Sequence, residues 1–248
     1  MVPVRVARLT ALLGGMLAAA AVGQPPPAPP EPPPAMPMKE KPPEWPKEVG
    51  GKQLLDWVAD LSNPDSSRKD AALRAIPQFG PPARKEAAKA LLPLLNDPDP
   101  GIRILTMSAI SVLGFDTRED MARAAQAMSS TVSKTLPGSM LRLHAARCLA
   151  LLGPEAHAGL PGLVYILESP TKEPSWEIRQ AVAAALGRIG APLYEDPPAV
   201  PPPAGAPPTP PKLRRPVSKT AMDKLAFVLL TDPSSGVRME AVQALLIL

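Results

Sequence analysis

The feature that most constrains the fold is a helical pattern that recurs in register along the chain. It is clearest in residues 177–190, EIRQAVAAALGRIG. With Arg179 as position 0, apolar or small residues fall at positions +3, +6, +7 and +10, which form one stripe of an α-helix. Gly190 at position +11 can close this helix. The pattern predicts an amphipathic helix that buries one face against a neighbour.

The same register occurs in four other places. Lys69, Arg103 and Arg142 each stand eleven residues before a glycine, as Arg179 does, and Arg238 begins a further copy. In every copy a small residue at +6 precedes a large one at +7, which favours close helix stacking because the small side chain lets two backbones approach. These pairs are Ala75-Ile76, Ala109-Ile110, Cys148-Leu149, Ala185-Leu186 and Ala244-Leu245.

Prolines mark a turn before each of these helices. Five residues before position 0 lie Pro64, Pro98, Pro137 and Pro233, whereas before Arg179 we assign Pro170 to the turn and treat residues 171–174 as an insertion. Steric restriction of the residue before proline ends the upstream helix at each turn. Asp99, followed by Pro100, and Ser175 are predicted N-caps.

A second amphipathic stretch precedes each turn, so each copy is predicted to be a helical hairpin. These stretches are 52–61, 84–95, 118–135, 156–168 and 219–231, with a capping box expected over 116–119 and bends expected at Pro93 and Pro161. Such hairpins cannot bury their apolar faces alone and must stack. The predicted fold is therefore all-α, an α-solenoid of about five stacked hairpins with disordered proline-rich segments.

The segments DPDPGIRILTMSAISVLG and SWEIRQAVAAALGRIG resemble HEAT repeats, in the short variety also seen in the phycobilin-lyase-type family. The resemblance covers residues 51–190 and 218–248. It implies a fold more than an activity, since the family includes adaptors, transport receptors, assembly scaffolds and a few enzymes. It also implies a ladder between adjacent repeats, in which turn aspartates meet position-0 arginines. The matching residues are Asp97, Arg103, Arg142, Arg179, Asp232 and Arg238.

The first 23 residues are predicted to be a secretory signal. Arg5 and Arg8 precede an uncharged apolar run of about 14 residues and a small-residue exit at 21–23. An uncleaved membrane anchor is the alternative, but this run is shorter than the roughly 20 residues that span a bilayer. We therefore expect export to a periplasmic, cell-envelope or secreted location. Without Arg5 and Arg8 the formal net charge falls from +4 to +2, so a nucleic-acid partner is not expected.

The 37 prolines are concentrated in two segments. Residues 24–49 are predicted to be a disordered spacer, and residues 191–217 a disordered loop that separates hairpins 1–4 (50–190) from a fifth, incomplete repeat (218–248). The loop carries the densest positive charge, Lys212, Arg214 and Arg215, which either solvates the loop or docks an acidic partner.

The sequence contains no constellation that indicates catalysis, a metal or a cofactor. Its lone Cys148 is predicted to be a small buried hydrophobe, and His144 an exposed residue of the concave face. No zinc-peptidase motif, nucleophile elbow or phosphate-binding loop is present. The repeated His-Glu pairs of dinuclear-iron hydroxylases built on this repeat are also absent, so we predict that the protein is not an enzyme.

Two functional hypotheses follow. The first is an exported, non-catalytic scaffold that binds a protein through its concave face, with His144, Arg147 and Gln180 as candidate contacts beside the loop cluster of Lys212, Arg214 and Arg215. The second is a structural or sensory cell-envelope module, a fragment of a larger repeat protein. It would self-associate through its C-terminal end, because Leu248 falls one residue short of the expected glycine.

Overall fold

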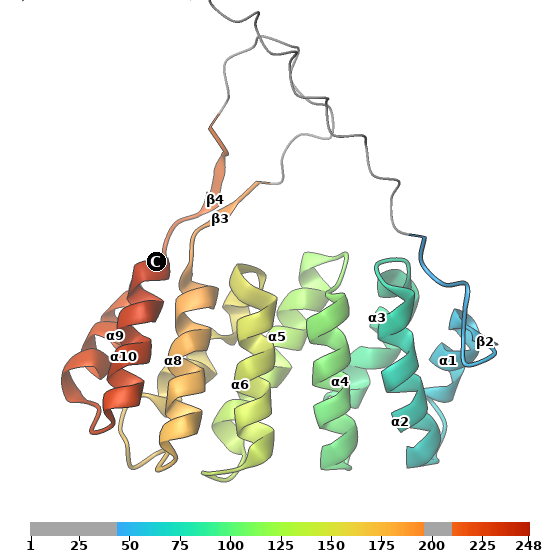
Figure 1. The fold of residues 1–248 in the computed structure, drawn as a ribbon, viewed down its shortest axis with the longest axis horizontal. Coiled ribbons are helices and arrows are strands. Elements are labelled where there is room, and N and C mark those ends of the chain that lie inside the picture. Colours follow the sequence, from blue (N-terminus) through green and yellow to red (C-terminus); the bar gives the residue numbers. More distant parts are fainter. Residues whose placement is uncertain (1–43, 196–209) are drawn as a thin grey trace, which may run out of the picture. The chain divides into compact units, whose positions relative to one another are not determined.

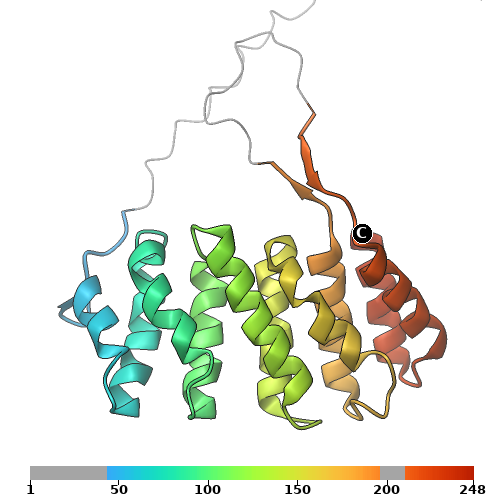
Figure 2. The ribbon, with the colours of Figure 1, turned by 180° about the vertical axis from the view of Figure 1, so that it is seen from behind.

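The computed structural model describes residues 44–195 and 210–248, which form five consecutive helical hairpins in two layers (Figure 1). The second helices of the hairpins form one layer: α2 (Ser66–Ala75), α4 (Pro100–Leu113), α6 (Met140–Leu152), α8 (Trp176–Gly190) and α10 (Ser235–Ile247). The first helices form the other, which Figure 2 shows from its own side: α1 (Leu54–Asp60), α3 (Ala83–Leu94), α5 (Arg118–Lys134), α7 (Leu160–Ile166) and α9 (Lys219–Thr231). The predicted all-α solenoid is confirmed.

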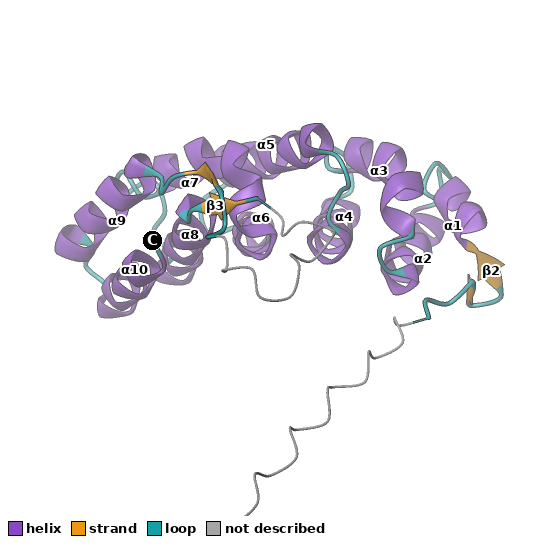
Figure 3. Cartoon of the chain, turned by 90° about the horizontal axis from the view of Figure 1, so that it is seen from above, coloured by secondary structure: helices purple, strands orange, loops and turns teal. Residues whose placement is uncertain are grey.

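The row of five hairpins is curved, with the second helices on its concave side (Figure 3). None of the helices in residues 44–195 and 210–248 is long and apolar enough to cross a membrane. The predicted signal peptide and residues 24–43 of the predicted spacer lie outside the described residues.

Helices begin at polar side chains that satisfy free backbone N–H groups in the first turn. Asp99 and Ser175 are N-caps as predicted, accepting hydrogen bonds from Gly101 and Ile178. The capping box expected over 116–119 is wrong by one residue. Thr117 is the N-cap of α5, and its hydroxyl accepts from the backbone N–H of Asp120. The other side-chain caps are Asp65, Ser139 and Ser218.

The fourth hairpin departs from the expected helix over 156–168. A 3-10 helix, η2 (Gly153–Gly159), precedes the short α7, so Pro161 lies in the first turn of α7 and does not bend a longer helix. Proline fits there because first-turn N–H groups have no helical partner. Pro93 lies inside α3 as predicted, and a second 3-10 helix, η1 (Ile76–Phe79), follows α2.

Close packing between second helices depends on small residues. All five +6 residues are buried, and a Cβ added to Gly187 would lie 2.6 Å from Cβ of Ala244, so α8 and α10 touch almost backbone to backbone. The closing role predicted for Gly190 is wrong. Gly190 is the last residue of α8 and has no positive φ; its missing side chain makes room for Ala221 of α9 instead.

Two short antiparallel strand pairs flank the helices. β1 (Glu48–Val49) pairs with β2 (Lys52–Gln53) through Gly50 and Gly51, whose φ angles of 58° and 74° favour glycine. β3 (Leu193–Tyr194) pairs with β4 (Leu213–Arg215), and we call this pair the ribbon. The pairing corrects the expectation of a loop without structure at these positions. Residues 196–209 lie outside the described part of the chain.

Substituting Gly187 tests the backbone contact between α8 and α10. Gly187→Ala should lower the free energy of unfolding by about 1–3 kcal/mol, because the new Cβ meets backbone atoms of Ala244 that cannot move independently. Urea denaturation followed by circular dichroism measures this. Gly236→Ala in α10 is the control, since its nearest non-local atoms lie 3.7 Å away or farther. Equal stability of the two variants would contradict the close approach.

Candidate functional site

A buried ion pair joins the fourth and fifth hairpins. Arg179 Nε and Nη2 donate to Asp232 Oδ2 and Oδ1 at 2.8 and 3.0 Å, and each side chain is only 4% exposed. Arg179 Nη1 also donates to the carbonyl oxygens of Glu173 and Pro174 in the turn of its own hairpin. Asp232 Oδ1 in turn accepts from the backbone N–H of Ser234. One guanidinium therefore connects two consecutive turns.

Two other position-0 residues reach forward to the next turn in the same way. Lys69 Nζ lies 2.7 Å from Asp97 Oδ2, and this hydrogen bond lowers the pKa of Asp97 below its usual value against the opposing effect of burial. Arg142 Nη1 donates to Glu173 Oε2 at 2.8 Å, with both side chains buried.

Arg103 and Arg238 contact only turn carbonyls among the described residues. Arg103 Nη1 donates to Asp97 O and Arg238 Nη1 to Asp232 O, at 2.5 and 2.7 Å. For Arg103 the reason is local, since the turn of the next hairpin has Leu136 where an acid would stand. The structure thus pairs Arg179 with Asp232, as the ladder prediction expected. Arg142 pairs instead with Glu173, and Asp97 pairs with Lys69, so neither contact is between two residues of the predicted ladder.

Glu173 is the residue that the sequence analysis missed. It precedes Pro174, which stands five residues before Arg179, the same spacing as the other turn prolines. The assignment of Pro170 to this turn is therefore wrong. The carboxylate of Glu173 accepts from the N–H groups of Gly138 and Ser175, as Asp232 does from Ser234. Aligning Pro174 by spacing would have found it.

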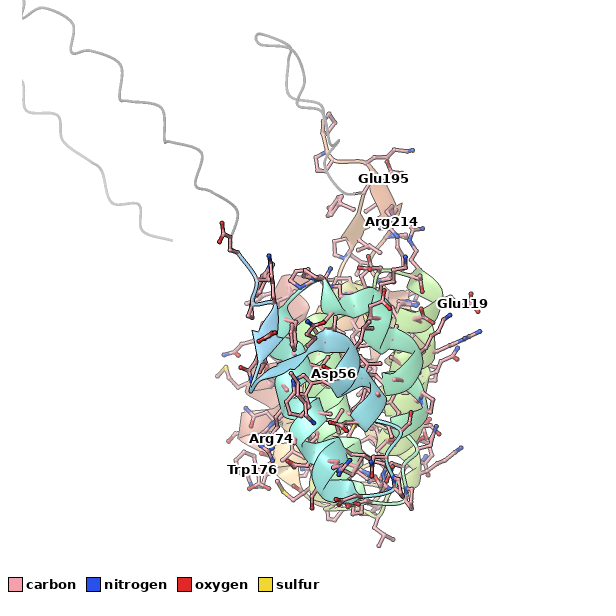
Figure 4. All side chains as sticks on the ribbon, turned by 90° about the vertical axis from the view of Figure 1, so that its right-hand side faces the viewer. Asp56, Arg74, Glu119, Trp176, Glu195 and Arg214 are labelled. Carbon is pink, nitrogen blue, oxygen red and sulfur yellow. The ribbon has the colours of Figure 1, made fainter. Side chains whose placement is uncertain are left out.

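A hollow of about 600 Å3 opens on the concave side over α6 and α8, and we call it the α6–α8 hollow. Trp176 and Leu151 contribute its large apolar side chains and are 49% and 62% exposed. Figure 4 shows Trp176 on the same side of the molecule as Arg74 of α2 and opposite Glu119 of α5. The other lining residues are Arg147, Ala150, Glu177, Gln180, Ala181, Ala184, Arg188 and Glu240.

The acidic and basic side chains that line the α6–α8 hollow differ in their hydrogen-bond partners. Glu240 accepts from Gln180 Nε2 at 3.2 Å, and Glu177 accepts from the hydroxyl of Ser175 at 2.9 Å. Arg147 and Arg188 are exposed, and neither guanidinium contacts a carboxylate in the part of the chain that the structure describes. The predicted contacts Arg147 and Gln180 therefore lie in one hollow.

His144 lies outside the lining of this hollow and is not the exposed residue that was expected. Its Nε2 is 2.7 Å from the hydroxyl of Ser108 on α4, and the side chain is half-buried. Burial, and secondarily the charge of Arg147, lower the pKa of His144 below 6.5. The imidazole links two second helices of neighbouring hairpins.

The basic cluster is mostly engaged with the body of the protein. Arg215 Nη2 donates to Pro154 O at 2.5 Å, and Arg214 lies 3.5 Å from a carboxylate oxygen of Glu155. Lys212 remains largely exposed beside Glu195, 3.1 Å away (Figure 4 labels Glu195 and Arg214). Arg214 and Arg215 thus anchor the ribbon.

The described residues include few groups suited to chemistry. Cys148 is buried as predicted, and burial raises the pKa of its thiol to about 11, which leaves little reactive thiolate near neutral pH. In residues 44–195 and 210–248, no three His, Cys, Asp or Glu side chains gather where they could hold a metal ion.

Comparisons with known proteins support the fold. The sequence matches no protein-family model and no curated protein. An engineered protein of solved structure is 20% identical, with 79% of this chain and 78% of that chain covered and a TM-score of 0.52. A designed armadillo repeat protein in complex with the peptide (KR)4 is 19% identical over 78% and 80%, with a TM-score of 0.51.

The complex of CpcE and CpcF of phycocyanin lyase from Nostoc sp. is 17% identical over 77% of this chain and 96% of that chain. Its TM-score is 0.46, and the fold assignment does not rest on this similarity. The structures with TM-scores above 0.5 show that the chain has the fold of an α-solenoid like that of armadillo repeat proteins.

Removing Arg179 tests whether the buried pair stabilises the array. Arg179→Ala should cost about 3–5 kcal/mol of unfolding free energy, because it leaves the buried carboxylate of Asp232 without its counter-charge. Thermal and urea denaturation measure the loss. Arg74→Ala, which breaks an exposed pair with Asp70, should leave stability unchanged within error. An unchanged melting temperature for Arg179→Ala would show that the pair has no structural role.

Proposed function

We propose that this protein is a non-catalytic scaffold that binds a segment of another protein on its concave face, with the α6–α8 hollow as the centre of the site. The observation that carries the proposal is the exposure of Trp176 and Leu151 in one hollow, next to polar side chains that can fix a ligand's orientation. Aromatic side chains in a recess are the residues that most often dominate binding energy in protein interfaces.

The fold supports the same proposal. A designed armadillo repeat protein of similar fold was solved in complex with the peptide (KR)4, so this class of solenoid can present a peptide-binding surface. The rigid stacking of α6, α8 and α10 holds the hollow in shape before a ligand arrives, which lowers the entropic cost of binding.

We further propose that the scaffold acts outside the cytoplasm. The support is the basic, apolar and small-residue order of residues 1–23, which is typical of a cleaved secretory signal.

Replacing Trp176 tests the proposed site. Peptides selected from a random phage-displayed library on the full chain should bind Trp176→Ala at least about tenfold more weakly, because the aromatic anchor is lost. Fluorescence anisotropy measures the affinities. Leu230→Ala on α9 of the outer layer is the control and should not change them. Failure to enrich any peptide, or peptides indifferent to Trp176→Ala, would contradict the proposal.

A specific observation favours the alternative function, a module that self-associates. Position +8 is occupied by a small residue in α4, α6 and α8, at Ser111, Ala150 and Gly187, but in α10 it is Leu246, which is 82% exposed. Met239 is exposed one heptad earlier on the same helix. These two side chains leave α10 with an apolar stripe.

Self-association through this stripe is tested by Met239→Lys with Leu246→Lys. The unsubstituted chain should show a mass above the monomer in light scattering after size exclusion, and the double variant should be monomeric because lysines are not readily buried in an apolar contact. Leu151→Lys in the α6–α8 hollow serves as the control. A monomeric unsubstituted chain at all concentrations would rule out this alternative.

A further inference from the structure

We infer that the ligand of the α6–α8 hollow is an extended acidic peptide segment, with Asp or Glu side chains next to apolar ones. The inference rests on the proposed function and adds the chemistry of the partner. It follows from the charges of the hollow, from the contacts those charges already make and from the shape of the surface between them.

The charges are separated along the helix axes. Glu177 stands two residues before position 0 of α8 and Glu240 two residues after position 0 of α10, near the turn end of the helices. Arg147 is at +5 of α6 and Arg188 at +9 of α8, toward the opposite end. By register the two arginines therefore lie farther from the turns than the two glutamates and about one helical turn apart, and both line the hollow.

The glutamates and arginines of the hollow differ in the partners that they already have. Glu240 and Glu177 each accept a hydrogen bond, from Gln180 and Ser175. Arg147 and Arg188 have no carboxylate partner among the described residues. An acidic ligand would supply the acceptors that the two guanidiniums lack, in charge-assisted bonds.

The surface between the two arginines suits an apolar side chain. Leu151 follows Arg147 by one helical turn, and Ala150 and Ala184 are small, so the recess beside the guanidiniums is apolar. A carboxylate bound to the arginines would place its neighbouring side chain over this recess. A nucleic-acid strand fits less well, because its phosphate backbone has no aliphatic side chain to fill this apolar recess.

The affinity of three labelled peptides for the full chain tests the inference. The probes are a nonapeptide that repeats Glu-Leu-Glu and versions with Gln or Lys in place of every Glu, compared with single-stranded DNA of similar charge. Fluorescence anisotropy should show the Glu peptide binding at least about tenfold more tightly than the others, with the preference weakening as salt is raised. Equal affinity for the Glu, Gln and Lys peptides, or tighter binding of DNA, would overturn the inference.

Reversing the charges of the two arginines tests whether they cause the preference for the Glu peptide. Arg147→Glu with Arg188→Glu should abolish the preference for the Glu peptide and create one for the Lys peptide. Lys85→Glu with Lys89→Glu on α3, exposed in the outer layer, changes the net charge equally and should keep the wild-type order. Arg147→Gln with Arg188→Gln replaces the first variant if that one fails to fold, and should lose the Glu preference without gaining the Lys one.

The two proposals fail in distinguishable ways. If phage-selected peptides depend on Trp176 but the Glu peptide has no advantage, the concave site stands and the acidic ligand is wrong. If the Glu peptide binds and the reversal of Arg147 and Arg188 leaves its advantage intact, the charge acts elsewhere and the inference is again wrong. If neither peptide set depends on the concave face, both proposals fail.

Discussion

The buried pair of Arg179 and Asp232 is the interaction on which the continuity of the solenoid depends. It joins α8 to the turn between α9 and α10 across 53 residues of sequence, which include the proline-rich segment. Burying two charges costs free energy, which here is offset by two guanidinium–carboxylate bonds, two bonds to turn carbonyls and one from the Ser234 N–H. The fifth hairpin is thus held at the same height and orientation as the others despite the long connection.

The alignment of the turns determines which side chains of neighbouring second helices meet on the concave face. Small residues at +6 then meet equivalent helices at close range, as Gly187 meets Ala244. Partly buried positions of neighbouring helices also become adjacent: Gln180 reaches Glu240, and His144 reaches Ser108. The α6–α8 hollow is one product of this register, because it needs residues from three consecutive second helices. A binding surface of this kind is a property of the stack and not of one hairpin.

Much of the fold was predictable because the helix periodicity, the turn prolines and the small-large pair at +6 and +7 are local in sequence. Three features were missed, and only the first of them could have been found from residue spacing. Glu173 was missed because the longer turn obscured the spacing of Pro174. The role of Gly190 depends on Ala221, 31 residues away, and the ribbon depends on hydrogen bonds between two ends of a proline-rich segment. None of these partners is visible to an argument that examines one helix at a time.

The candidate site divides in the same way. The amino-acid sequence by itself determined that the chain forms stacked helical hairpins, where four of the five turns lie, and that Arg147 and Gln180 are on the concave side, since each follows from a period of 3.6 residues and a repeated register. Only the tertiary structure decided which charges are paired. Arg179 is buried with Asp232, while Arg147 and Arg188 have no carboxylate partner within residues 44–195 and 210–248, because pairing depends on which side chains of different hairpins come within a few ångströms once the turns are aligned.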